Sequence, residues 1–417
     1  MQNQENIGQE TLSKTSAPER WGVYIHIPFC RQKCFYCDFP SFAGKDKFQE
    51  AYIEALCREI RQQGLFYRQQ WGKPSTIYIG GGTPSILSEI LLEQLLTTIA
   101  ETLNLRSAPP LGELSPTATE GVPPQGRPEF TVECNPGTLT LSKLQILRRL
   151  GVNRISIGVQ SFDDVLLHRI GRIHTGAQAV KAVQAARAAG FANVSLDLMY
   201  GLPGQSLDDL RNSMAQTFAL APDHISIYGL QLEAGTAFAR MQEMGRLHLP
   251  DEDTVEAMYD LMTHELPAHG YARYEISNFA HLGFESRHNL GYWHGVPYLG
   301  LGAAAHSYLG GVRYENTADI ETYISSIKEG KLPRAVEEPA TRTIQMEEAA
   351  FLALRTAKGI SRTRFAHRFG VTLDSIYAPV IKKLVQQGVL ADEGENVHLT
   401  AKGAKYGNLV FEAFLLD

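Results

Sequence analysis

The stretch Tyr24-Ile-His-Ile-Pro-Phe-Cys30-Arg-Gln-Lys-Cys34-Phe-Tyr-Cys37 leads from a short hydrophobic strand into a loop with three cysteines. The CxxxCxxC spacing is typical of an iron–sulfur site, because three thiolates can hold a cubane at three corners and leave the fourth iron open to a small molecule. A zinc knuckle would need a fourth Cys or His nearby, and a disulfide framework would need an oxidising compartment, so both alternatives fit less well. The other two cysteines, Cys57 and Cys134, are expected to be buried thiols.

Apolar, β-rich runs alternate with helical patterns through the first half of the chain. This alternation predicts an α/β fold with a parallel sheet, either an incomplete barrel of six βα units or a doubly wound sheet. The predicted strands lie at 23–28, 76–80, 130–135, 154–159, 194–199 and 225–230. The predicted helices lie near 46–69, 86–104, 140–150, 176–189, 207–220 and 251–268.

Unusual residues follow the carboxyl ends of these strands, the edge that carries the active site in barrels. Gly80-Gly81-Gly82-Thr83-Pro84 is a turn whose backbone can approach a ligand closely, although a glycine triplet is also common in ordinary tight turns. Glu133 ends the third strand, as a hydroxyl acceptor or a solvated acid, and Gln160 follows the fourth. Asp197 lies among apolar neighbours and needs a partner, for which we expect Arg172. Singly, each could also be a structural group.

Composition changes along the chain indicate four parts. We expect a disordered tail at 1–20, a barrel at 21–245 with a flexible Pro- and Gly-rich insertion at 107–128, a linking region at 246–335, and a winged-helix-like domain at 336–417. The last part has helical patterns near 345–357, 361–369 and 373–387. Winged helices often bind DNA, but Lys and Arg barely outnumber Asp and Glu there, so a lid or docking role is expected instead.

The overall composition predicts a soluble, cytoplasmic protein. A net charge of −6 over 417 residues argues against a general nucleic-acid binder. No apolar stretch is long enough to cross a bilayer. The polar N-terminal residues lack the features of a secretory or transit peptide.

The cysteine spacing matches the radical S-adenosylmethionine (SAM) superfamily, and the run from Tyr24 to Phe39 resembles its branch of oxygen-independent coproporphyrinogen III oxidases and heme chaperones. The resemblance favours the partial (β/α)6, TIM-like barrel. It implies a [4Fe-4S] cluster whose open iron chelates SAM, held by Cys30, Cys34 and Cys37. It also implies a SAM pocket lined by Tyr24, Tyr36, Gly81, Gly82, Thr83, Glu133, Gln160, Arg172 and Asp197.

A second element, Arg287-His288-Asn289-Leu290-Gly291-Tyr292-Trp293, is similar to the His-Asn-x-x-Tyr-Trp element of the heme chaperone group. The resemblance implies heme binding by His288, Asn289, Tyr292 and Trp293, with His288 as the candidate iron ligand. Imidazole can ligate heme iron, and aromatic rings can cover a porphyrin face. A His beside two aromatics is, however, more often a packed, hydrogen-bonded element.

Two features separate the chaperones from the oxidases of this branch. The oxidases carry a fourth cysteine two places after the third, where this chain has Phe39, and they have a longer N-terminal region. We therefore expect a heme chaperone that delivers heme to an acceptor hemoprotein, with no catalytic residue assigned. Coproporphyrinogen III oxidation is the alternative, and a cluster-bearing DNA-binding regulator is a weaker one.

Overall fold

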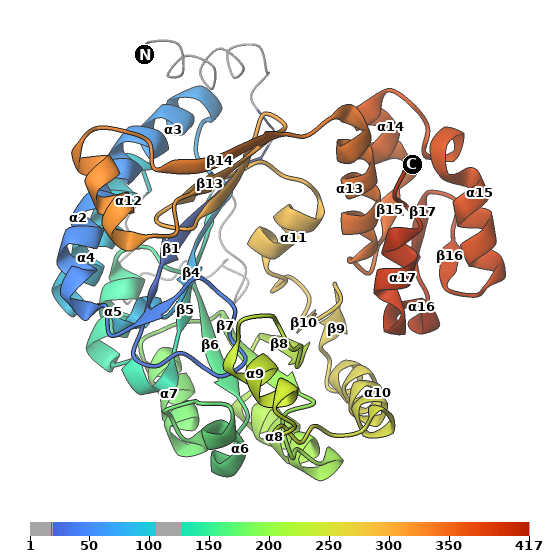
Figure 1. The fold of residues 1–417 in the computed structure, drawn as a ribbon, viewed down its shortest axis with the longest axis horizontal. Coiled ribbons are helices and arrows are strands. Elements are labelled where there is room, and N and C mark those ends of the chain that lie inside the picture. The colour runs from blue at the N-terminus through green and yellow to red at the C-terminus, as the bar shows by residue number, and fades with distance from the viewer. Residues whose placement is uncertain (1–17, 19, 106–126, 417) are drawn as a thin grey trace, which may run out of the picture.

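The structure is a computed structural model that describes residues 18, 20–105 and 127–416 (Figure 1). The expected tail at 1–20 and the expected insertion at 107–128 lie almost entirely outside the described residues.

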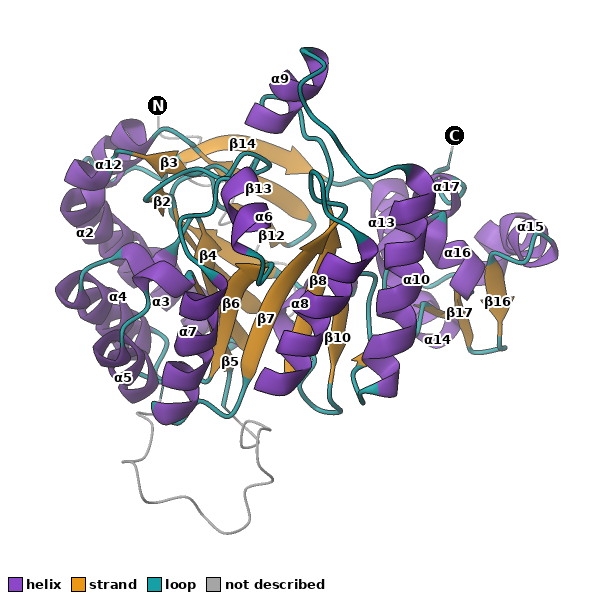
Figure 2. Ribbon diagram, turned by 90° about the horizontal axis from the view of Figure 1, so that it is seen from below, coloured by secondary structure: helices purple, strands orange, loops and turns teal. Residues whose placement is uncertain are grey.

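A 12-stranded sheet dominates the described part of the chain (Figures 1 and 2). Six neighbouring strands run parallel and in chain order, and their bounds match the six predicted strands to within one residue. These strands are β1 (Gly22–Ile27), β4 (Thr76–Gly81), β5 (Glu129–Cys134), β6 (Arg154–Gln160), β7 (Val194–Tyr200) and β8 (His224–Gly229). The α/β class with a partial barrel is therefore confirmed.

Helices between these strands cover the outer face of the sheet (Figure 2). They are α2 (Gln49–Glu59), α3 (Leu65–Trp71), α4 (Glu89–Thr102), α5 (Leu141–Arg149), α6 (Asp164–Arg169), α7 (Gly176–Ala188) and α8 (Leu207–Leu220). The predicted helix at 46–69 is two helices, because the π-helical turn Ile60–Gly64 interrupts it. The β-branched core residues of the parallel strands, such as Ile25, Ile79 and Ile157, are fully buried, which explains why these strands are continuous apolar runs in the sequence.

The region at 246–335, expected as a linker, adds strands to the same sheet. Beside β1, β11 (Tyr298–Leu301) runs parallel, and β12 (His306–Leu309), β13 (Val312–Asn316) and β14 (Arg334–Pro339) follow antiparallel. The other edge has β10 (Asn278–Ala280) and β9 (Ala272–Arg273). The helix α9 (Ala237–Glu243) precedes this region, and the helices within it are α10 (Glu252–Ala268), α11 (Arg287–Trp293) and α12 (Ile320–Lys328). These strands extend the barrel sheet at both edges, and the two edge strands, β14 and β9, do not pair with each other. The sheet is therefore open.

The C-terminal part has its own apolar core, built around Leu354, Tyr377 and Phe414. Its elements follow the order of a winged helix: α13 (Arg342–Leu354), β15 (Ile360–Ser361), α14 (Arg362–Phe369), α15 (Leu373–Gln386), β16 (Leu390–Asp392) and β17 (Asn396–Leu399), then α16 (Ala401–Lys405) and α17 (Gly407–Glu412). Figure 1 shows α11 between the sheet and this helical domain. Among the described residues, no helix is both long and apolar enough to span a membrane.

Candidate functional site

The three cysteines of the first motif lie on one loop at the carboxyl end of β1. Cys30 ends β2 (Phe29–Cys30), and Cys34 and Cys37 follow before β3 (Phe42–Ala43), which pairs with β2. All three thiols are free; Cys30 is buried, and the other two are partly exposed. The loop is fixed at its centre, because the Phe35 N–H donates to the Ile170 carbonyl at 3.1 Å.

The glycine turn after β4 packs directly on this loop. The N–H of Gly82 donates to the Ile27 carbonyl, and that of Thr83 to the Phe29 carbonyl, both at 2.8 Å. A Cβ on Gly82 would lie 2.6 Å from the Phe29 oxygen and 3.0 Å from Cys30 Sγ, so no side chain fits. The absence of a side chain at Gly82 therefore lets the turn pack directly against the first thiol, and the expected approach of its backbone to a ligand stays a prediction.

Arg172 lies against the second thiol. Its Nη1 is 3.7 Å from Cys34 Sγ, and its Nη2 donates to the Gly158 carbonyl. The guanidinium therefore places a positive charge beside one of the three thiols of the loop. Its buried Nε has no partner among the described residues.

The expected pairing of Arg172 with Asp197 is wrong. The Asp197 carboxylate accepts from Ser156 Oγ at 3.2 Å, and no ion pair joins it to an arginine among the described residues. Burial is the main cause that raises the pKa of Asp197, and hydrogen bonds from Ser226 and Ser156 and the nearby Arg154 and Arg172 oppose it. Two serine hydroxyls thus take the place of the cation that we expected. Their hydrogen bonds satisfy the buried carboxylate, and Arg172 contacts Cys34 instead.

Glu133 links the glycine turn to the interior of the barrel. Its carboxylate accepts from the Tyr78 hydroxyl at 2.7 Å and from the Gly81 N–H at 3.1 Å. Burial raises the pKa of Glu133 to about 7, with the Asp197 carboxylate adding to the rise and Tyr78 opposing it. The group therefore titrates near neutral pH and can hold or release a proton beside the turn.

The other predicted SAM residues lie on β1, at the end of β6 and on the cysteine loop. Tyr24 bonds to His26 Nδ1 at 2.9 Å, and its ring stacks with that of Tyr78 at 6.3 Å. Gln160 has a positive φ of 66°, which is uncommon for a residue other than glycine. Tyr36 packs against an apolar cluster that includes Ile170. The residues predicted from the sequence thus come from five neighbouring strands and the loops after them, with Tyr24 and Asp197 inside their strands and the others near or after strand ends.

The sequence reasoning missed the residues beneath this rim. His26 contacts both the Tyr24 hydroxyl and, at 2.8 Å, the Pro40 carbonyl, so it braces the cluster loop from below. Arg154 is buried, and its charge acts on both Glu133 and Asp197. Strand alternation could have indicated His26, because residues two apart in a strand lie on the same face and His26 follows Tyr24 by two.

The second element forms α11, at the opposite end of the strands. His288 lies beneath the first residues of β1 and β4: its Nδ1 bonds to Thr76 Oγ1 and its Nε2 to the Tyr292 hydroxyl, both at 2.8 Å. The ring is buried, and burial lowers the pKa of His288 to about 3. It stacks on Tyr78, with ring centroids 5.0 Å apart. Both ring nitrogens are therefore occupied in this structure.

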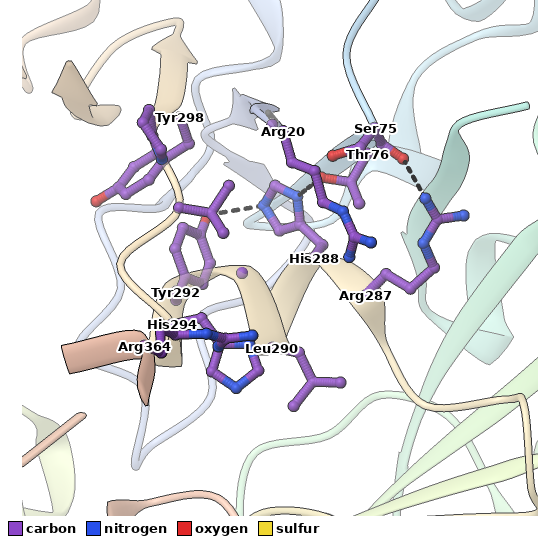
Figure 3. A pocket seen from close by; sticks show the side chains of 14 residues that line it. Arg20, Ser75, Thr76, Arg287, His288, Leu290, Tyr292, His294, Tyr298 and Arg364 are labelled. Carbon is purple, nitrogen blue, oxygen red and sulfur yellow. Dashed lines mark hydrogen bonds between the residues drawn. The ribbon is translucent and has the colours of Figure 1, made fainter. Parts of the chain in front are cut away.

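The other three residues of this element are all partly buried. Asn289 and Tyr292 are half-buried, and Trp293 receives the Arg355 guanidinium over its ring at 4.6 Å. A cavity opens beside the element (Figure 3), lined by Arg20, Gly22, Ser75, Thr76, Arg287, His288, Leu290, Gly291, Tyr292, His294, Val296, Pro297, Tyr298 and Arg364. The structure therefore separates the two predicted sites, with the cysteine loop at one end of the barrel and α11 at the other.

Comparisons with known proteins agree with this geometry. Residues 24–216 match the model of the radical SAM superfamily, and residues 340–405 match that of the HemN C-terminal domain. "Heme chaperone HemW" of Bacillus subtilis is 41% identical over 94% of this chain and 98% of that protein. The protein of the same name from Escherichia coli is 33% identical, over 95% and 98%. The chain belongs to the HemW family.

A solved structure supports the fold of this HemW-family chain. Coproporphyrinogen III oxidase (HemN) from Escherichia coli, described as a radical SAM enzyme, superposes with a TM-score of 0.81 over 97% of this chain and 92% of that chain. The identity is 19%, so this likeness concerns the fold alone. The predicted superfamily and branch are confirmed.

The superfamily's cofactors are a [4Fe-4S] cluster and SAM, and the loop of this HemW-family chain fits the cluster. Three free thiols share one loop, Gly82 lets the glycine turn pack against the first, and the orphaned Nε of Arg172 belongs to the guanidinium beside the second. Among residues 20–105 and 127–416, no three His, Cys, Asp or Glu side chains lie close enough to hold a single metal ion. The individual contacts to the cluster and to SAM stay predictions.

Proposed function

We propose that this chain binds heme and passes it to an acceptor hemoprotein. The observation that carries the proposal is similarity over nearly the whole chain to proteins named heme chaperones, 41% and 33% identical in the two cases above. The element at 288–293 supports it, because His288, Asn289, Tyr292 and Trp293 lie on one short helix beside a cavity.

The cysteine loop is proposed to hold the [4Fe-4S] cluster through Cys30, Cys34 and Cys37. When bound by three thiolates, such a cluster offers an open iron to a small ligand, here SAM. The chain's own residues prepare the site: Arg172 supplies positive charge at Cys34, and the glycine turn packs beside Cys30 with no side chain at Gly82. Glu133 holds this turn in place through the Gly81 N–H.

The proposed cluster site and the proposed heme site lie at opposite ends of the barrel strands. The cluster and SAM belong to the carboxyl ends of the strands, whereas the heme element lies beneath their amino ends. A porphyrin at α11 would not face the open iron across a shared cavity. This arrangement supports carriage of heme over its chemical conversion, and it disfavours the alternative of coproporphyrinogen III oxidation.

The test uses the full chain, reconstituted anaerobically with iron and sulfide. Titration with ferric heme should give a saturable Soret change, and adding apomyoglobin should then move the heme to myoglobin. Coproporphyrinogen III with SAM and a reductant should yield no protoporphyrinogen. Absence of saturable heme binding would overturn the proposal, and turnover of coproporphyrinogen III would replace it with the oxidase alternative.

A further inference from the structure

The cavity beside α11 is too small for a porphyrin in the arrangement that the structure shows. Its volume is about 160 Å³, whereas small-molecule and cofactor sites enclose about 300–1,000 Å³. His288 and Tyr292 both line it, and Figure 3 shows the His288 ring joined to Thr76 on one side and to Tyr292 on the other. The contacts of His288 therefore indicate which bond must break before an iron can reach the ring.

One side of the imidazole is closed by two strands of the barrel. Nδ1 of His288 lies 2.8 Å from Oγ1 of Thr76, the first residue of β4. On the neighbouring strand β1, a Cβ added to Gly22 would lie 2.8 Å from Thr76 Oγ1 and 3.4 Å from His288 Nδ1. The Thr76–His288 pair thus fits only because Gly22 has no side chain, and both members are buried. An iron cannot approach Nδ1 from this side.

The start of α11 is anchored as well, so the helix backbone keeps this side of the ring in place. The Glu129 carboxylate accepts from the backbone N–H groups of Arg287 and His288, at 2.9 and 3.0 Å. The Ser286 hydroxyl caps the same end of the helix. Both Glu129 and Ser286 are buried. A carboxylate is a favourable partner for the free N–H groups at a helix start, so the backbone of His288 is held firmly.

The other side of the imidazole has a partner that can leave. Nε2 of His288 lies 2.8 Å from the hydroxyl of Tyr292, which follows four residues later on the same face of the helix. Among the described residues this hydroxyl has no second hydrogen-bond partner. Tyr292 is only partly buried and lies in the last turn of α11, away from the anchored end. Breaking this single contact frees Nε2 toward the cavity.

The chemistry of the two hydroxyls favours one position for the ring proton. A phenol is more acidic than an aliphatic alcohol and is the better donor, so the Tyr292 hydroxyl donates to Nε2 and Nδ1–H donates to Thr76 Oγ1. In metal sites, a ligating histidine commonly donates its other ring N–H to an oxygen acceptor, which fixes the tautomer and makes the ligand more basic. His288 and Thr76 already have this arrangement.

We propose that Nε2 of His288 is the atom that binds the heme iron, that Thr76 is a positioning residue for this ring, and that the Tyr292 hydroxyl covers Nε2 until heme arrives. On binding, the hydrogen bond from Tyr292 breaks and an iron–nitrogen bond forms. The ring keeps its proton on Nδ1, and Tyr292 keeps its own. The inference rests on the proposed function and specifies the ligand atom and the contact that binding must replace.

The cover is tested by ferric heme titration of the full chain after anaerobic reconstitution. Tyr292→Phe removes the competing hydroxyl and keeps the ring, so it should bind heme about fivefold more tightly, because one neutral hydrogen bond no longer has to break. Tyr298→Phe is the matched control: its ring packs on that of Tyr292 at 4.7 Å and lines the same cavity, but both nitrogens of His288 have other partners. This control should keep the wild-type Kd.

The role of Thr76 is tested by the midpoint potential of the bound heme, measured by spectroelectrochemical titration. Thr76→Val keeps the shape of the side chain and removes the acceptor. It should weaken heme binding about tenfold and raise the potential, because a less basic imidazole stabilises ferric iron less. Thr76→Ser should restore both values. A threonine that served only packing would change the Kd and leave the potential of the heme unchanged.

The outcomes separate the inference from the function on which it rests. Binding by Tyr292→Phe that is equal to or weaker than that of the wild type would overturn the cover. An unchanged potential in Thr76→Val, or a potential that Thr76→Ser does not restore, would overturn the role of Thr76. If the wild type binds no heme, the proposed function itself fails, and the inference fails with it.

Discussion

Glu133→Gln should be more stable than the wild type at alkaline pH, and this advantage should disappear at acidic pH. Burial raises the pKa of Glu133 from its usual 4.5 to about 7. Between these two pH values the folded protein binds more protons than the unfolded chain, so this group lowers stability as pH rises. By linkage, the cost is about 1 kcal/mol at pH 5 and about 3 kcal/mol at pH 8.

The glutamine side chain removes this pH-dependent cost but cannot accept both existing hydrogen bonds. Losing the bond from Tyr78 or from the Gly81 N–H costs about 1 kcal/mol. Glu133→Gln should therefore equal the wild type at pH 5 and exceed it by about 2 kcal/mol at pH 8.

Urea unfolding followed by tryptophan fluorescence is a suitable assay. The chain has three tryptophans, Trp21, Trp71 and Trp293, and none lies in the C-terminal domain. Glu54→Gln, an exposed carboxylate paired with Arg58, serves as the control and should show little pH dependence. A stability difference between Glu133→Gln and the wild type that stays constant from pH 5 to pH 8 would refute the reasoning.

Three further predictions concern the cysteine loop, each read as iron and sulfide per chain after anaerobic reconstitution. Cys34→Ser should abolish the [4Fe-4S] absorption while Cys57→Ser retains it, and zinc in the purified wild type would contradict the assignment. Gly82→Ala should lower cluster content because its Cβ would lie 2.6 Å from a loop carbonyl, whereas Gly137→Ala, with no neighbour nearer than 3.7 Å, should not. Arg172→Gln should reduce cluster content by removing the cation 3.7 Å from a thiol, and unchanged content would show that this charge is dispensable.

The sequence predicted the parallel strands well because burial on both faces makes each one a continuous apolar run. It did not predict β11–β14, which are short, come late in the chain and mix exposed with buried residues; β14, for example, is exposed along most of its length. The helix α6 was also missed, because a helix of only six residues shows little periodicity.

Site residues were predictable where a motif fixed them and not where the fold had to bring them together. The cysteine loop and the glycine turn carry their own spacing, and the structure places them in contact. The partner of Asp197 was mistaken because a sequence shows which residue is charged, but not that two serines on neighbouring strands satisfy the carboxylate first. That Arg364 of the C-terminal domain lines a cavity together with residues of α11 follows only from the packing of that domain against α11.

One tyrosine has contacts toward both ends of the barrel. The Tyr78 hydroxyl holds the carboxylate that serves the glycine turn, and its ring lies flat against the imidazole of His288 beneath the sheet. A single rigid aromatic side chain therefore connects the two ends of the partial barrel. A ligand that displaces Glu133 or His288 would also displace Tyr78. Binding at one end of the barrel could therefore be transmitted to the other end through this one side chain.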